Sequence, residues 1–226
     1  MPPWKRTLDV ALGLAVIPIL AICTLFIAIM LKFCSPGPTF FTQERIGYKG
    51  RRFRIYKFRT MTVGADVSAH RAHYSELMSS NAPMVKLDSA GDRRLIPGGW
   101  LLRASGLDEL PQLLNVLNGD MSLVGPRPCL PYEYENYSPW QKERFNSTPG
   151  LTGLWQVSGK NRTTFEEMIR LDHAYTENLS LWLDAKIILL TVPALLLQIG
   201  DVRSARTKKT PGQQQRFSPF PFRITK

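Results

Sequence analysis

The longest apolar run in the chain lies near its N-terminus. Val10–Leu31 holds 22 residues without a charge, and about 20 apolar residues in a helix cross a bilayer. The run is longer than the apolar region of a signal peptide, and no small-residue cleavage site follows it. Lys5 and Lys32 flank the run and Pro18 interrupts it. Because cations favour the cytoplasmic side and proline breaks a helix, we predict a re-entrant helix-hairpin with its membrane kink at Pro18 rather than a full span.

A β-hairpin is predicted directly after the membrane segment. Residues 35–38 read Ser-Pro-Gly-Pro, a strong break signal. Two short stretches, 39–45 and 52–59, are rich in aromatic and β-branched residues, with Gly47 and Gly50 between them. This pattern is typical of two antiparallel strands joined by a short turn.

The most informative helix begins near residue 107. Pro111 has no N–H to donate and is tolerated only in the first turn of a helix, which places the start at Leu107 or Asp108. Leucines at helical spacing follow, and Asn118-Gly119 supplies the stop. Asp108 and Glu109 therefore lie at a helix N-terminus, where free N–H groups and the helix dipole favour negative charge.

Weaker patterns complete the middle of the chain. Residues 67–78 and 165–177 have helical spacing of apolar positions, and the polar, Gly- and Pro-rich residues 81–99 predict a loop. Residues 149–153 form a second rigid loop, after which 154–157 has the composition of a short strand.

The C-terminal region divides into an apolar and a basic part. Residues 185–198 are apolar but number only 14, a length typical of an interfacial helix rather than a span. Residues 203–226 contain seven Lys or Arg and no acid and are rich in Pro and Gln, which favours disorder. We therefore predict an α+β, membrane-associated fold: a membrane segment 1–34, a cytosol-facing domain 35–202 with a helical core and interfacial amphipathic helices, and a basic tail.

The charge balance indicates an anionic partner. The formal charge is +11, from 29 Lys and Arg against 18 Asp and Glu. A nucleic acid, a phospholipid surface and a phosphorylated substrate all suit this excess. The three cysteines are widely spaced and odd in number, so they predict neither a zinc site nor a disulfide framework.

Candidate chemistry centres on Asp108 and Glu109. Alone, such a pair is most often a simple helix cap. Four cations accompany it. Arg103 and Arg127 flank the pair in the sequence, and Lys57 and Arg59 project from the basic predicted strand 52–59. Guanidinium groups bind phosphate bidentately. Carboxylates among such cations would repel a polyanion unless a divalent metal bridges them, as Mg²⁺ does between carboxylates and phosphate oxygens. The pattern predicts phosphoryl transfer beside a membrane, with a carboxylate as a candidate nucleophile.

Five stretches, in order along the chain from about Lys5 to Gln198, resemble the signature of the bacterial sugar transferases, the monotopic polyprenyl-phosphate hexose-1-phosphate transferases. The matching stretches are 40–47 (FFTQERIG), 56–61 (YKFRTM), 105–128 (SGLDELPQLLNVLNGDMSLVGPRP), 149–159 (PGLTGLWQVSG) and 180–187 (SLWLDAKI). One detail departs from the family, whose membrane segment usually carries a Ser-Pro break at the positions of Ala21 and Ile22. Pro18 lies one helical turn earlier and on nearly the same helix face.

The resemblance implies a covalent mechanism. Asp108 would attack the phosphate that bears the sugar in a UDP-sugar, releasing UMP, and polyprenyl (undecaprenyl) phosphate would then take the phosphosugar. Glu109 would either bind Mg²⁺ (or Mn²⁺) together with Asp108 or deprotonate the lipid phosphate. The cations Lys57, Arg59, Arg103 and Arg127 would hold phosphates. The enzyme would lie in the bacterial inner membrane with its catalytic domain in the cytoplasm, and the resemblance leaves open whether it forms a homodimer.

Two other functions fit the sequence less well. A membrane-tethered nucleic-acid-binding protein would use the basic, aromatic strand 51–59, but the carboxylates Asp108 and Glu109 among the cations argue against a nucleic acid partner. An inactive scaffold for polysaccharide assembly finds no support, because every residue expected of the site is present. The sequence specifies neither the sugar nor the glycan pathway.

Overall fold

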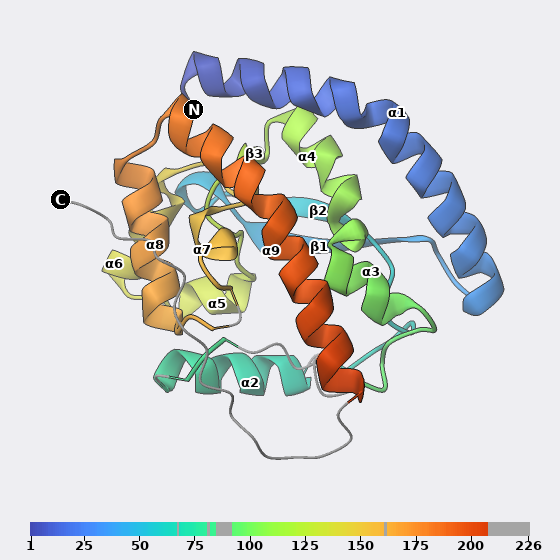
Figure 1. Cartoon of the computed structure of the whole chain (residues 1–226). Coiled ribbons are helices and arrows are strands. Elements are labelled where there is room, and N and C mark those ends of the chain that lie inside the picture. The colour runs from blue at the N-terminus through green and yellow to red at the C-terminus, as the bar shows by residue number, and fades with distance from the viewer. Residues whose placement is uncertain (67, 81, 85–91, 161, 208–226) are drawn as a thin grey trace.

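The computed structural model describes residues 1–66, 68–80, 82–84, 92–160 and 162–207. Within them the fold is α+β, with two long apolar helices on the outside of a domain of short helices and two small sheets (Figure 1). The elements are α1 (Pro3–Cys34), β1 (Phe40–Ile46), η1 (Tyr48–Gly50), β2 (Arg52–Phe58), α2 (Ser68–Ser79), α3 (Gly99–Ser105), η3 (Leu107–Gln112), α4 (Leu113–Asn118), β3 (Ser122–Val124), α5 (Pro131–Glu135), α6 (Pro139–Lys142), η4 (Glu143–Asn146), β4 (Gly150–Thr152), α7 (Leu154–Val157), α8 (Phe165–Glu177) and α9 (Leu181–Thr207).

Two small sheets carry the loops that reach the site. β1 and β2 form the predicted antiparallel hairpin, with Phe40 opposite Phe58. β3 and β4 pair in parallel, which no local pattern predicted. A Cβ on Gly125 would lie 2.2 Å from the carbonyl oxygen of Thr148, so only glycine allows this approach. The loop after β3 and the loop before β4 are therefore held side by side.

The first helix is continuous through its proline. The sequence predicted a helix-hairpin with a break at Pro18, whereas α1 is one helix of 32 residues with Pro18 inside it. It curves along the outside of the domain instead of folding back on itself (Figure 1). Proline removes one helical hydrogen bond and crowds the preceding turn, and a bend accommodates both without ending the helix.

A buried polar network fastens the N-terminal part of α1 to the domain. The Lys5 ammonium lies 2.5 Å from the Asp184 carboxylate of α9, and these side chains are only 3% and 1% exposed. Lys5 also donates to the Tyr175 hydroxyl of α8 at 3.0 Å. One turn on, Asp9 accepts from the Leu123 N–H at 2.9 Å. These contacts fix the start of α1 against α8, α9 and β3.

The C-terminal part of α1 packs on the same domain. Ile27 and Leu31 join a buried cluster with Phe58, Ile96 and Leu102. The opposite face of the helix is apolar and exposed, as is one face of α9. The large exposed residues on the two helices include Ile19, Ile22, Leu25, Phe26, Phe33, Trp182, Leu189, Val192 and Leu196. Both helices are long and apolar enough to cross a membrane, and their outer faces favour contact with lipid.

The structure agrees to different degrees with three of the predicted elements. The helix expected at 165–177 is α8 with the same bounds, begun by a Thr164 capping box. The strand expected at 154–157 was wrong, because this stretch is the short helix α7; so short an apolar run does not separate strand from helix. The apolar helix expected at 185–198 is longer, since α9 has 27 residues.

The extension of α9 corrects the boundary of the predicted tail. Residues 203–207 were assigned to a disordered tail but are helical. Composition misled here because the polar residues Arg203, Ser204 and Arg206 are compatible with a helix. The rest of the tail, 208–226, lies outside the described residues.

Replacing Lys5 tests whether the buried network holds the fold. Lys5→Met leaves the Asp184 carboxylate buried without its cation, which we expect to lower the free energy of unfolding by about 3–5 kcal/mol. Urea unfolding in detergent micelles, followed by tryptophan fluorescence, measures the change. Lys32→Met is the control, because Lys32 is exposed at the other end of the same helix. Equal losses in the two variants would show that the network carries no special stability.

Candidate active site

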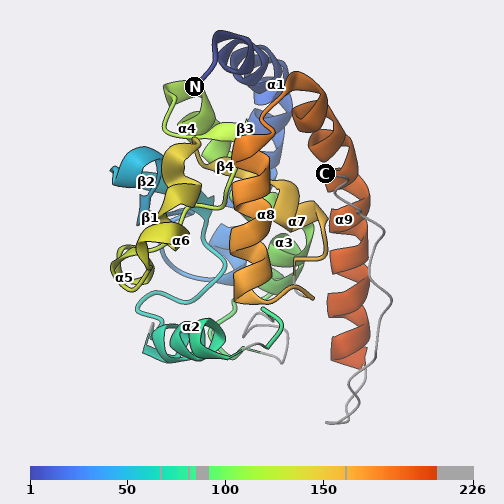
Figure 2. The same ribbon diagram turned by 90° about the vertical axis from the view of Figure 1, so that its left-hand side faces the viewer.

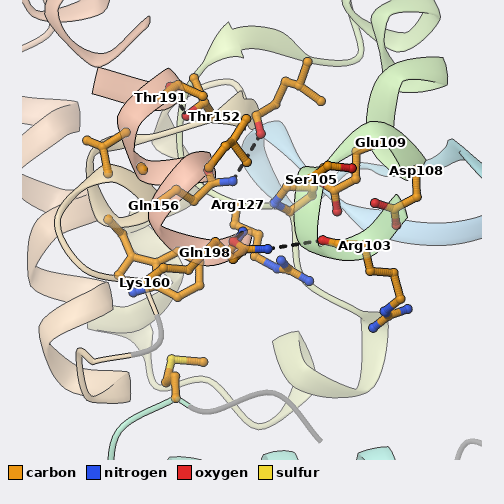
Figure 3. Close-up of a pocket in the computed structure, with 18 of the residues that line it drawn as sticks. Arg103, Ser105, Asp108, Glu109, Arg127, Thr152, Gln156, Lys160, Thr191 and Gln198 are labelled. Atoms are coloured by element: carbon orange, nitrogen blue, oxygen red, sulfur yellow. Dashed lines mark hydrogen bonds between the residues drawn. The ribbon is translucent and has the colours of Figure 1, made fainter. Parts of the chain in front are cut away.

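A cavity of about 770 Å³ opens between the two long helices and the domain. Its polar wall contains five of the residues that the sequence singled out: Lys57, Arg103, Asp108, Glu109 and Arg127. Its other wall is largely apolar and comes from α1 and α9, with Leu12, Val16, Ile188, Val192 and Leu195 among its members. Figure 2 shows α9 covering one side of the domain, and Figure 3 shows polar side chains from several elements around the pocket. The cavity therefore has charged side chains on one wall and apolar side chains on the other.

A tight turn presents the acidic pair. α3 ends at Ser105, and Gly106 adopts φ 73°, a left-handed conformation that suits glycine. η3 begins at once, and the Glu109 N–H donates to the Gly106 carbonyl at 3.0 Å. The predicted start near Asp108 is confirmed, although the first six residues form a 3-10 turn before α4. Asp108 and Glu109 therefore sit in the first turn of a helical segment.

Strand β2 brings a cation to this turn. The Lys57 ammonium lies 2.7 Å from Glu109 Oε1. Burial lowers the pKa of Lys57, and the carboxylates of Glu109 and Asp108 counteract that effect. Burial also acts to raise the pKa of Glu109, but the charges of Lys57, Arg127 and Lys160 outweigh it and hold that pKa well below its usual range. Glu109 is therefore a carboxylate at neutral pH.

The Arg127 loop is held from beneath by a buried ion pair. Arg144 donates to the Arg127 carbonyl at 3.0 Å, and its guanidinium lies 2.5 Å from the Asp172 carboxylate of α8. Both side chains of the pair are almost fully buried. The backbone of Arg127 is thus fixed where its own charge acts on Glu109. Arg103, in the last turn of α3, lines the same cavity.

Arg59 does not line the cavity, contrary to its predicted place beside Lys57. It is buried and clamps the loop that leaves α1, donating to the Pro38 carbonyl at 2.6 Å and to the Ser35 hydroxyl and carbonyl at 2.9 Å each. Residues two apart share a strand face, but β2 ends at Phe58, so the alternation does not extend to Arg59.

Sequence reasoning missed Lys160. This residue lines the cavity and donates to Gln198 Oε1 at 3.1 Å. Lys160 lies 51 positions after Glu109, and no spacing rule connects the two. Its one available signal was its place directly after the stretch 149–159 that matches the sugar transferase signature. Thr152 and Gln156 also line the cavity from β4 and α7 (Figure 3).

The carboxylates of the cavity bear on whether it could hold the predicted Mg²⁺. Among the described residues, no group of three or more His, Cys, Asp or Glu is placed to hold an ion. Asp108 and Glu109, neighbours in the sequence, both line the cavity, and Lys57 occupies one oxygen of Glu109. Mg²⁺ commonly takes one or two carboxylates, with waters and substrate phosphates as its other ligands. The residues present fit an ion of this kind.

Comparison with known proteins decides the family. The sequence model of the family described as bacterial sugar transferase matches residues 2–198. The chain belongs to the bacterial sugar transferases. This transferase is 43% identical over 197 residues to the galactosyl transferase CpsE of Streptococcus agalactiae, covering 87% of this chain and 43% of that protein.

Two other relatives are covered more completely. The exopolysaccharide production protein ExoY of Sinorhizobium fredii is 38% identical over 204 residues, 87% of each chain. The UDP-glucose:undecaprenyl-phosphate glucose-1-phosphate transferase of Caulobacter vibrioides is 42% identical over 200 residues, 85% of this chain and 69% of that protein. The transferase thus spans most of the rhizobial relative but less than half of the streptococcal one.

Replacing Lys57 tests the electrostatics of the acidic pair. In Lys57→Met the nearest cation is lost while burial continues to favour the neutral acid, so the pKa of Glu109 should rise. A carboxyl ¹³C NMR titration in micelles, with Glu109→Gln to assign the signal, measures this shift. Lys49→Met removes an exposed hairpin cation and should leave the pKa unchanged. An unchanged Glu109 pKa in Lys57→Met would contradict the assigned role.

Proposed function

We propose that this chain transfers a sugar-1-phosphate from a UDP-sugar to undecaprenyl phosphate, a polyprenyl phosphate. The reaction would be the first membrane step in assembling an exopolysaccharide, O-antigen, capsule or glycoprotein glycan. The observation that carries the proposal is one cavity in which an acidic pair, Asp108 and Glu109, lies among cations and faces an apolar wall from α1 and α9, the two helices long and apolar enough to cross a membrane. The Caulobacter relative, whose name states this chemistry for glucose, supports the same reaction class.

The proposed chemistry has two displacements at one phosphorus atom. The Asp108 carboxylate oxygen forms a bond to the phosphorus that bears the sugar, and the bond from that phosphorus to the bridging oxygen breaks. UMP leaves with the electron pair. A phosphate oxygen of undecaprenyl phosphate then bonds to the same phosphorus, the bond to Asp108 breaks, and the carboxylate is regenerated. The covalent intermediate divides one difficult transfer into two easier ones.

The other residues lower the cost of bringing anions together. Lys57, Arg103, Arg127 and Lys160 would neutralise and align the phosphates, since positioning and charge stabilisation dominate phosphoryl transfer. Asp108 and Glu109 would hold Mg²⁺ or Mn²⁺, which when bound neutralises diphosphate charge. Glu109, ionised at neutral pH, is also able to accept a proton from the lipid phosphate. Arg59 is not assigned to phosphate binding, because its donors are used on Ser35 and Pro38.

The proposal includes a re-entrant placement of α1. Lys5 near its start and Leu31 near its end are both buried against the same domain, and the apolar face between them is exposed. If the domain lies in the cytoplasm, then both ends of α1 lie on the cytoplasmic side and its curved middle enters the inner membrane without crossing it. The flanking cations Lys5 and Lys32 favour the same arrangement. The cavity would then open at the depth of the lipid phosphates.

An Asp108 variant tests the reaction. With the purified protein, undecaprenyl phosphate, Mg²⁺ and a panel of UDP-sugars, we expect continuous UMP release that requires both the lipid and the metal. Asp108→Asn should lower turnover roughly a thousandfold or more, because it removes the nucleophile. Asp120→Asn, which alters an exposed carboxylate after α4, should retain activity. Full activity of a folded Asp108→Asn variant would overturn the covalent mechanism.

Cysteine labelling tests the membrane placement. Cys34 is exposed at the end of α1 and Thr7 is exposed near its start. With Cys23→Ala and Cys129→Ala in place, one variant retains Cys34 and another carries Thr7→Cys with Cys34→Ser. A membrane-impermeant maleimide should label both variants in inverted vesicles and neither in intact spheroplasts. Labelling of the two positions from opposite sides would show a full span instead.

A further inference from the structure

The side-chain amide of Gln198, on α9, reaches from this largely apolar helix into the cavity of the candidate active site. Gln198 is 9% exposed, although the residues directly before it, Leu196 and Leu197, are largely exposed. Its side chain points into the cavity between α3 and Lys160 (Figure 3). A polar group in such a place is stable only when its donors and acceptors are paired.

The nitrogen of this amide caps the helix that precedes the acidic pair. Gln198 Nε2 donates to the carbonyls of Arg103 and Ala104 at 3.2 and 3.1 Å. The last carbonyls of a helix have no partner within it, and a side chain from another helix meets that need here. Gly106 and η3 follow directly, so the contact fixes the chain four residues before Asp108.

The oxygen of the same amide holds a cation. Gln198 Oε1 accepts from the Lys160 ammonium at 3.1 Å. Lys160 has a positive φ of 23°, which is unusual for a residue other than glycine and persists only where the surroundings fix it. The charge of Lys160 helps to keep Glu109 ionised. Gln198 therefore joins the two sides of the cavity.

We propose that Gln198 is a positioning residue that couples α9 to the site, setting the place of Lys160 relative to the Asp108 turn. The amide meets both needs, whereas a carboxylate cannot donate to the α3 carbonyls and an ammonium cannot accept from Lys160. The inference rests on the proposed function for its kinetic consequence, in which Lys160 binds phosphate and Asp108 is the nucleophile. Displacement of α9 would then disturb both Lys160 and Asp108 through the Gln198 side chain.

Three substitutions separate the two halves of the amide. Gln198→Glu retains the acceptor for Lys160 and loses the donors to α3, so kcat should fall while KM for the UDP-sugar stays close to the wild-type value. Gln198→Lys retains a donor to α3 but repels Lys160, so KM should rise with little change in kcat. Gln198→Leu should show both effects. We expect each to be roughly five- to tenfold, the size of one or two lost hydrogen bonds. Leu196→Ala, on the exposed face of α9, is the control.

Hydrogen exchange tests the coupling without any substrate. Exchange of the backbone amides of residues 103–112, measured by mass spectrometry, should accelerate in Gln198→Glu and Gln198→Leu but not in Gln198→Lys or Leu196→Ala. If the wild-type protein releases no UMP from any UDP-sugar, the proposed function fails and the exchange pattern alone decides the inference. Wild-type exchange in Gln198→Leu would overturn the inference. The inference would also be overturned if all three Gln198 variants showed the same fall in kcat, the same rise in KM and the same faster exchange. That result would indicate a merely structural residue.

Discussion

The buried contact between Lys5 and Asp184 is the interaction on which the arrangement of the molecule depends. It joins the first turn of α1 to the first turn of α9, so both lipid-compatible helices start from one point on the domain. The Tyr175 hydroxyl lies 2.8 Å from Asp184 Oδ1 and 3.1 Å from the Val124 carbonyl at the end of β3. A buried charge is tolerated only with partners in good geometry. The ion pair thereby ties the two helices to the strand that leads into the Arg127 loop.

Local signals were sufficient for the elements that the sequence predicted correctly. The turn at Asp108 followed from one proline and its following leucines, and the hairpin followed from two glycines between stretches rich in aromatic and β-branched residues. Helix α8 has a capping box at Thr164 and apolar positions at helical spacing, which mark its start and its buried face. In each case the residues that decide the conformation lie within a few positions of one another, so the sequence alone is informative. The acidic pair was found for the same reason.

The remaining features depend on contacts between distant segments. Lys57 and Arg59 appear equivalent in the sequence, but the end of β2 and the loop after α1 direct one to the cavity and the other to a structural clamp. Lys160 and Gln198 carry no motif, and their roles arise only because α9 packs against α3 and α7. The course of α1 along the domain likewise depends on contacts at both of its ends, through Lys5 near the start and Leu31 near the end. These outcomes are set by packing, which local propensity does not encode.

The composition of the cavity explains why charge and lipid contact occur together. Glu109 is only partly exposed, and three cations keep it ionised beside an apolar wall from α1 and α9, where charges interact more strongly than in bulk water. Under the proposed function, the same wall would accept the tail of the lipid substrate while its phosphate reaches those cations. A water-soluble site would lose much of this electrostatic effect to solvent, and a wholly apolar site would not hold a diphosphate. The helices that place the domain at the membrane therefore also form the surroundings in which its charged residues act.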